Sequence, residues 1–279
     1  MPNWTTGLCQ AGGAGIHYQR TGGGRPPLVL LHGLSGNGAC WTPLARCLQA
    51  EFDVVMPDAR GHGHSSAPRD GYRYDDHAGD VIGLIRELGL ATPILLGHSM
   101  GGMTAGVVAS RVGDELGGVI LVDPTFLSPQ RQREVFDSDV AEQHRRLLSR
   151  SKDEVLADIR TRHPHRSAEM LELLAEARLQ TRLGAFEVLT PPNPDYRQLI
   201  STISVPVLLV IGDVRAGAVV SPETATELQD LNPRVHVEQI QGAGHGMPYD
   251  QPERLGAMLR LFPTGLGALG GIGRMMKWF

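Results

Sequence analysis

Cysteine is scarce in this chain. Only three cysteines occur among 279 residues, at Cys9, Cys40 and Cys47, and no two of them form a Cys-x-x-Cys pair. An odd number without that spacing excludes a disulfide framework and a zinc site built from paired cysteines. We therefore expect reduced, partly buried thiols and a cytoplasmic location.

Long apolar runs and a large net charge are also missing. No stretch of about 18 consecutive apolar residues occurs, so no transmembrane helix is expected. The first residues, MPNWTTGLCQAGG, lack a basic segment followed by an apolar one, which argues against a signal peptide. The formal net charge of -4 is too mild to indicate nucleic acid or an anionic membrane as a partner.

Motifs for nucleotides and metals are absent as well. The segment GLSGNG (33–38) holds three glycines, but their spacing differs from the dinucleotide fingerprint, and no G-x-x-x-x-G-K-[ST] sequence occurs. No Asp or Glu is spaced to join His62 and His64 in a metal site, and the two histidines of HPH (163–165) flank a proline in a turn. We expect neither a cofactor nor a metal ion.

Short apolar runs alternate with helical patterns along most of the chain. The Gly-rich AGGAG (11–15) signals a hairpin. Runs with the character of strands follow, most of them rich in apolar residues, at 15–20, 28–33, 52–58, 92–97, 117–123, 205–213 and 235–240. Helical patterns separate most of them, at 42–50, 75–90, 101–113 and 221–231. The alternation predicts an α/β fold with a mainly parallel, eight-stranded sheet covered by helices on both faces.

One interval breaks this alternation. From 125 to 198 only polar helical patterns occur, and SKDE (151–154) has the form of a capping box. We interpret 125–198 as a helical cap inserted into a core of residues 1–124 and 199–262, long enough to cover a site. The Gly-rich tail 263–279 is expected to be a frayed end, with docking on the body or on a second subunit as the alternative.

A serine stands where one apolar run meets a helical pattern. Gly97-His98-Ser99-Met100-Gly101 follows a predicted strand and opens a predicted helix. A serine on so sharp a turn takes a positive φ, and the turn closes only if the residues two before and two after lack bulk. This G-x-S-x-G pattern predicts a nucleophile elbow with Ser99 as nucleophile and the Met100 N–H as one oxyanion donor.

From about Gly15 to Phe262 the chain resembles the α/β-hydrolase family. Besides the elbow, HGLSGN (32–37) resembles the family's oxyanion loop, DARGHGHS (58–65) its D-x-R-G-x-G-x-S loop, and GAGHGMPYDQPERL (242–255) its catalytic-histidine loop. The resemblance implies that His245 is the catalytic base and that the Leu34 N–H is the second oxyanion donor.

The third member of the triad is a carboxylate with two candidate positions. The commonest family position, in G-x-x-D at the end of the predicted strand VPVLLVIG (205–212), holds Arg215 here, and Asp213 lies two residues early. The family also places its acid at the end of the preceding strand, where this chain has Asp123. We favour Asp123, because adjacent parallel strands end at the same edge, and keep Asp213 as the alternative.

The remaining polar residues of these motifs have structural interpretations. His32 and His98 are expected to pack and hydrogen-bond near the site, whereas His62 and His64 are expected to be solvent-facing turn residues. Asp58 is expected to anchor the loop that follows it.

Together these features predict a serine hydrolase that cleaves a carboxylic ester or lactone through an acyl-enzyme. The same triad could support C–C bond hydrolysis or cofactor-free perhydrolysis, and a third possibility is a non-catalytic ligand-binding protein with a hydrolase fold. The expected partner is a small-molecule ester or lactone, and a homodimer is possible. The composition leaves open which ester or lactone binds.

Overall fold

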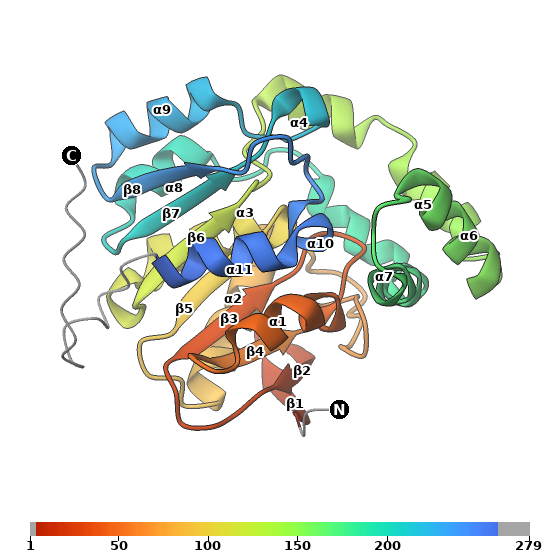
Figure 1. Ribbon diagram of the computed structural model, residues 1–279, viewed down its shortest axis with the longest axis horizontal. Helices are drawn as coiled ribbons and strands as arrows, with labels where there is room; N and C mark the ends of the chain where they lie inside the picture. Colours follow the sequence, from red (N-terminus) through yellow and green to blue (C-terminus); the bar gives the residue numbers. More distant parts are fainter. Residues whose placement is uncertain (1–3, 262–279) are drawn as a thin grey trace.

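The computed structural model describes residues 4–261, which contain one eight-stranded sheet in the order β1-β2-β4-β3-β5-β6-β7-β8 (Figure 1). The strands are β1 (Thr5–Ala11), β2 (Ala14–Arg20), β3 (Pro27–Leu31), β4 (Asp53–Pro57), β5 (Ile94–His98), β6 (Gly118–Val122), β7 (Val207–Ile211) and β8 (Val235–Gln239). Strands β3 to β8 pair in parallel, whereas the hairpin strands β1 and β2 pair antiparallel. The predicted fold class is confirmed.

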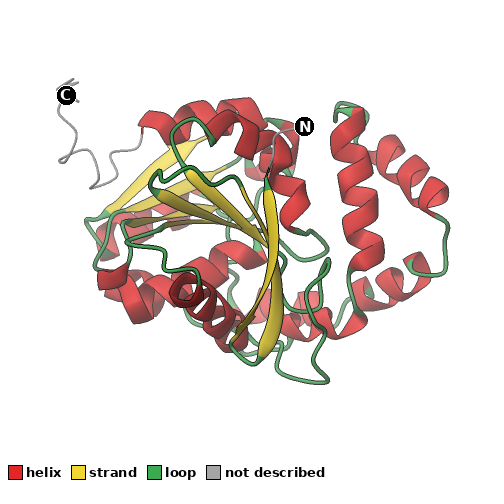
Figure 2. Ribbon diagram, turned by 90° about the horizontal axis from the view of Figure 1, so that it is seen from below, coloured by secondary structure: helices red, strands yellow, loops and turns green. Residues whose placement is uncertain are grey.

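Helices cover both faces of the sheet because its central strands are apolar on both sides (Figure 2). In β3, Val29 and Leu31 point into one core cluster, and Leu28 and Leu30 into the other. The first face is covered by α2 (Tyr74–Glu87), α3 (Met100–Val112), α8 (Tyr196–Thr202) and α9 (Pro222–Leu231). The second face is covered by α1 (Thr42–Leu48), α10 (Met247–Asp250) and α11 (Pro252–Leu261). The sequence therefore buries two hydrophobic layers around one sheet.

Within the described chain, no strand occurs between Val122 and Val207. The interval contains α4 (Pro129–Phe136), α5 (Val140–Leu147), α6 (Lys152–Arg162), α7 (Ala168–Gln180) and the 3-10 segment η3 (Leu183–Leu189). In Figure 1, α5, α6 and α7 form a group at the right-hand side, beyond the sheet. The expected capping box is present, since Ser151 and Glu154 hydrogen-bond each other's backbone at the start of α6. Assignment of 125–198 as a separate cap stays a prediction.

These helices have an apolar cluster of their own, formed by α6 and α7 around Cys40 of the 3-10 segment η1 (Gly38–Trp41). Polar contacts also join α7 and the preceding loop to the rest of the molecule. Asn37 Nδ2 donates to Gln180 Oε1 over 2.9 Å, and Arg166 pairs with Asp250 over 2.6 Å. The contact between the inserted helices and the sheet domain is thus both apolar and polar.

Two shorter 3-10 segments, η2 (Gly113–Glu115) and η4 (Val214–Ala216), precede β6 and follow β7. Among residues 4–261, no helix combines the length and hydrophobicity needed to cross a membrane. The predicted tail 263–279 and the last predicted core residue, Phe262, lie outside the described residues.

Candidate active site

Ser99 is the single residue between the end of β5 and the start of α3, and its backbone is strained, with φ +56° and ψ -119°. The turn closes because its flanking residues have no side chain. A Cβ on Gly97 would lie 2.1 Å from the carbonyl oxygen of Gly101, and a Cβ on Gly101 would lie 2.2 Å from that of Leu31. A non-glycine residue in such a region costs about 1–3 kcal/mol, so the surrounding packing must hold it.

A chain of hydrogen bonds links Ser99 to His245 and Asp123. Ser99 Oγ–H donates to His245 Nε2 over 2.9 Å, and His245 Nδ1–H donates to Asp123 Oδ2 over 2.6 Å. Asp123 directly follows β6, the strand beside β5, and His245 lies in the loop before α10. The three residues are widely separated in the sequence, and the parallel strand ends bring them to one edge of the sheet.

The carboxylate of Asp123 is completely buried yet fully hydrogen-bonded. The backbone N–H of Val219 donates to both of its oxygens, over 3.0 and 2.9 Å, and that of Val220 donates to Oδ1 over 2.9 Å. These donors stabilise a negative charge that burial alone would destabilise. Asp213, the alternative acid, instead accepts the N–H of Arg215 at the start of η4. The structure therefore brings Asp123, and not Asp213, to His245.

The backbone amides of Leu34 and Met100, both near Ser99, have no acceptor within residues 4–261. Leu34 belongs to a tight turn in which Gly36 N–H donates to the Gly33 carbonyl over 3.0 Å and Ser35 has φ +64°. This turn lies against Ser99, because a Cβ on Gly33 would be 3.1 Å from Ser99 Cβ. Met100 is the first residue of α3, where the helix dipole favours negative charge. Both amides are free to bind an anionic oxygen.

His98 fixes the loop that carries His245. Its Nε2–H donates to the carbonyl of His245 over 2.7 Å, and the two rings lie 4.7 Å apart. Burial is the main cause that lowers the pKa of His98 to about 3, followed by the neighbouring His245. His98 is therefore neutral at neutral pH. As expected, it packs and hydrogen-bonds near Ser99, and its hydrogen bond goes to the carbonyl of His245.

The 58–65 loop is anchored by Asp58, as expected. Asp58 accepts the backbone N–H of Gly38 over 2.7 Å and that of His64 over 2.9 Å. The expectation for His62 is wrong: His62 is fully buried, whereas His64 is exposed. The cause is backbone curvature, since Gly61 and Gly63 both have positive φ, which turns His62 inward and His64 outward.

A cavity of about 430 Å³ lies between α4 and the loop before α9. It is lined by Tyr74, Thr125, Leu127, Arg131, Gln132, Val135, Leu189, Asn193, Gly217, Ala218 and Val219. Thr125 connects the cavity to the elbow, because its N–H donates to the Ser99 carbonyl over 3.3 Å and its hydroxyl contacts the Tyr74 hydroxyl over 3.0 Å. The sequence carries no motif that marks Tyr74 or Thr125, because their pairing depends only on the packing of α2.

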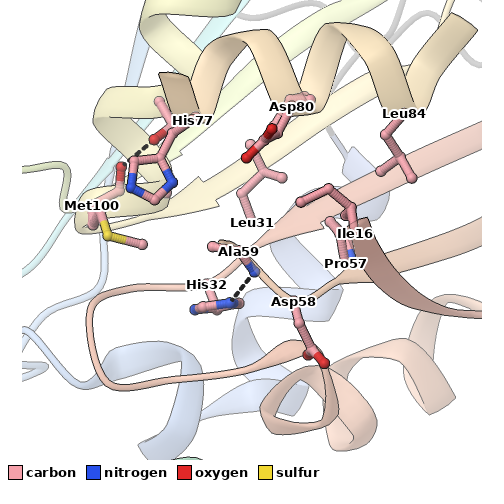
Figure 3. Close-up of a pocket in the computed structure, with 13 residues that line it drawn as sticks. Ile16, Leu31, His32, Pro57, Asp58, Ala59, His77, Asp80, Leu84 and Met100 are labelled. Carbon is pink, nitrogen blue, oxygen red and sulfur yellow. Dashed lines mark hydrogen bonds between the residues drawn. The ribbon is translucent and has the colours of Figure 1, made fainter. Parts of the chain in front are cut away.

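A smaller cavity of about 30 Å³ lies under the elbow, between α2 and the ends of β3 and β4 (Figure 3). Figure 3 shows His77 on its wall near Met100, with Asp80 and Leu84 further along α2. His77 is 3% exposed, and its Nε2 has no hydrogen-bond partner among the described residues. Burial, followed by the charge of Arg60, lowers its pKa to about 3. His77 is thus a neutral histidine with an unsatisfied nitrogen.

Between residues 4 and 261, no group of three or more His, Cys, Asp or Glu side chains is arranged to hold a metal ion. The polar atoms of Ser99, His245 and Asp123 are already engaged with one another.

Comparison with known proteins agrees with the fold. The family model of the alpha/beta hydrolase fold matches residues 26–252. The chain belongs to the α/β-hydrolase family.

Two relatives match this α/β-hydrolase over most of its length. It is 30% identical to N-formylmaleamate deformylase of Pseudomonas putida over 88% of this chain and 91% of the relative. It is 29% identical to 2-(acetamidomethylene)succinate hydrolase of Mesorhizobium japonicum over 84% of this chain and 86% of the relative. Among solved structures, N-formylmaleamic acid deformylase of Pseudomonas putida S16 superposes with a TM-score of 0.78 at 25% identity, covering 91% of this chain and 99% of that one.

Replacement of His77 tests the unsatisfied nitrogen under the elbow. We expect His77→Leu to raise the free energy of unfolding by about 1–2 kcal/mol at pH 7, because it removes a buried polar atom without a partner. The difference in unfolding free energy between His77→Leu and wild type should be about 2 kcal/mol larger at pH 5 than at pH 7. The pKa of His77 is about 3 in the folded protein and about 6.5 in the unfolded chain. As pH falls below about 6.5, only the unfolded chain takes up the proton, so the free energy of unfolding of the wild-type protein decreases.

Urea unfolding at pH 7 and pH 5 measures both effects. The matched control is His165→Leu at an exposed histidine, which should change stability by less than about 0.5 kcal/mol. A His77→Leu gain that is the same at both pH values would contradict the assignment of a neutral, buried His77.

Proposed function

We propose that this α/β-hydrolase cleaves carboxylic esters or lactones with Ser99 as nucleophile and an acyl-enzyme as intermediate. The observation that carries the proposal is the unbroken hydrogen-bond chain from Ser99 through His245 to Asp123. A protein that only binds a ligand has no need of this chain, nor of a strained serine held beside two free amides. The geometry therefore favours turnover over binding alone.

Each residue has a role that follows from its contacts. His245 Nε2 takes the proton of Ser99 Oγ as the oxygen attacks the substrate carbonyl, and the amides of Leu34 and Met100 hold the developing oxyanion. His245 then donates the proton to the leaving alcohol. In the second half, His245 takes a proton from water as its oxygen attacks the acyl carbon. The bond from the acyl carbon to Ser99 Oγ then breaks, His245 returns the proton to Oγ, and a carboxylic acid is released.

Asp123 orients His245 and stabilises it when it is charged. Its contact with His245 Nδ1 leaves Nε2 unprotonated in the resting state, which is the tautomer that can accept the serine proton. The three backbone contacts from Val219 and Val220 hold the carboxylate in place. The carboxylate of Asp123 is thus held in one orientation, whereas 36% of the His245 side chain is exposed beside Ser99.

The substrate is a small molecule on this proposal. The cavity of about 430 Å³ beside Thr125 falls within the range of small-ligand pockets, about 300–1,000 Å³. Its walls combine apolar side chains such as Leu127, Leu189 and Val219 with the hydroxyls of Tyr74 and Thr125. We assign the acyl or alcohol part of the substrate to this cavity.

A second candidate reaction is hydrolysis of an acyl–nitrogen bond. The observation in its favour is the similarity to N-formylmaleamate deformylase, and the steps are the same except that His245 protonates a leaving amine. C–C bond hydrolysis and cofactor-free perhydrolysis would use the same three side chains and stay predictions.

Replacement of Ser99 tests the nucleophile. With a panel of p-nitrophenyl esters, lactones and an N-formyl amide that bears a carboxylate, we expect wild type to hydrolyse at least one class and Ser99→Ala to lose about 10⁶-fold in kcat. A fluorophosphonate probe should label wild type and leave Ser99→Ala unlabelled. Labelling that survives the substitution, or wild-type protein that neither labels nor hydrolyses, would refute the proposal.

Replacement of the two aspartates separates the candidate acids. Asp123→Asn should lower kcat by about 10⁴-fold, because an amide at this position no longer favours the His245 tautomer that accepts the serine proton. Asp213→Asn serves as the control and should stay within about threefold of wild type, since the side chain of Asp213 accepts the backbone N–H of Arg215 and does not contact His245. A larger loss for Asp213→Asn than for Asp123→Asn in steady-state ester hydrolysis would reverse the assignment.

A further inference from the structure

The turn that carries the Leu34 amide is hydrogen-bonded to two buried histidines. His32 precedes the turn, and its Nδ1–H donates to the Gly33 carbonyl over 2.8 Å. His62 belongs to the 58–65 loop, and its Nε2 accepts the N–H of Ser35 over 3.4 Å. The two bonds engage the peptide groups on both sides of Leu34.

The first bond sets the direction of the Leu34 N–H. The carbonyl of Gly33 and the N–H of Leu34 belong to one peptide group, which is planar and trans, so the two point in opposite directions. The His32 bond, together with the Gly36 N–H that donates to the same carbonyl over 3.0 Å, therefore aims the Leu34 N–H away from His32. The bond from Ser35 to His62 fixes the next peptide plane, and so limits rotation about the Leu34 backbone.

The two histidines also tie the turn to the neighbouring loop. His32 Nε2 accepts the N–H of Ala59 over 2.9 Å, as Figure 3 shows, and His62 Nδ1–H donates to the carbonyl of Arg60 over 3.0 Å. Their rings meet edge to face with centroids 5.0 Å apart. Each ring thus bridges the turn and the loop with one donor and one acceptor nitrogen.

This arrangement requires both rings to be neutral, and their surroundings favour that form. Both are buried, and burial is the main cause that lowers the pKa of each. Arg60, the nearest cation on the loop, is neutralised by a bidentate pair with Asp80 over 2.7 and 2.6 Å. A protonated His62 would lose the lone pair that accepts from Ser35.

We propose that His62 is a positioning residue of the oxyanion hole, acting with His32 to aim the Leu34 amide through the backbone of residues 33–35. His62 itself does not reach the reacting atoms; it acts by holding the Ser35 amide. The inference rests on the proposed function for its catalytic consequence, whereas the hydrogen-bonding geometry stands on its own.

Three variants in the same short loop test it. His62→Leu removes the acceptor, and we expect kcat for the best ester to fall about 10- to 100-fold with KM within about twofold, because a misaimed donor weakens binding of the transition state only. His62→Gln, whose side-chain oxygen can accept from Ser35, should stay within about threefold of wild type. His64→Leu is the matched control, since its side chain is exposed, and should leave kcat unchanged.

Equal kcat values for His62→Leu and wild type would overturn the proposal, as would equal losses for the Leu and Gln variants. ¹⁵N NMR of the wild-type histidines gives a readout that needs neither turnover nor a folded Leu variant, with the His62 signals assigned from their absence in His62→Gln. A protonated Nδ1 and an unprotonated Nε2 at neutral pH are expected. The opposite tautomer, or a doubly protonated ring, would overturn the proposal even if wild type hydrolyses esters.

Wild type that neither labels with fluorophosphonate nor hydrolyses any substrate, yet shows the expected His62 tautomer, would refute the proposed function and leave the His62 contact supported.

Discussion

Closure of the backbone at Ser99 is the constraint on which the rest of the site depends. The strained residue is held by its own peptide groups: Ser99 N–H donates to the Val122 carbonyl over 3.1 Å, and the Ser99 carbonyl accepts the amides of Met103 and Thr125 over 3.1 and 3.3 Å. Two of these three bonds reach the end of β6 or the segment after it. Because Asp123 stands between Val122 and Thr125, the same bonds that stabilise the turn at Ser99 also fix the position of Asp123.

The buried charged groups around this turn have partners of opposite charge or hydrogen-bond donors, and most of the buried histidines are neutral. Asp123 has backbone donors and His245, and Arg60 has Asp80. Burial lowers the pKa values of His32, His62, His77 and His98, so these rings act as directional hydrogen-bonding groups rather than as cations. An uncompensated charge here would cost several kcal/mol, whereas a neutral ring adds orientation at a smaller desolvation cost.

The helices inserted between β6 and β7 contribute part of the wall of the large cavity, and Tyr74 with residues 217–219 contributes another part. Helix α4 supplies Arg131, Gln132 and Val135 to the large cavity, and η3 supplies Leu189. None of the three linked residues Ser99, His245 and Asp123 comes from this interval. On the proposed function, the reacting groups therefore come from the sheet domain, whereas the inserted helices supply part of the cavity assigned to the substrate.

Local patterns in the amino-acid sequence were enough to predict the sheet, the helices on both faces, the elbow at Ser99 and the placement of His245, because each depends on short-range periodicity or on a compact motif. Asp123 and Asp213 both follow apolar strands, and only the path of the loop before α9, which brings Val219 and Val220 to Asp123, decided between them. The inward turn of His62, the unsatisfied His77 and the pairing of Tyr74 with Thr125 were decided by tertiary packing alone. Segments far apart in the chain bury these side chains and supply their hydrogen-bond partners, so a local sequence pattern cannot predict them.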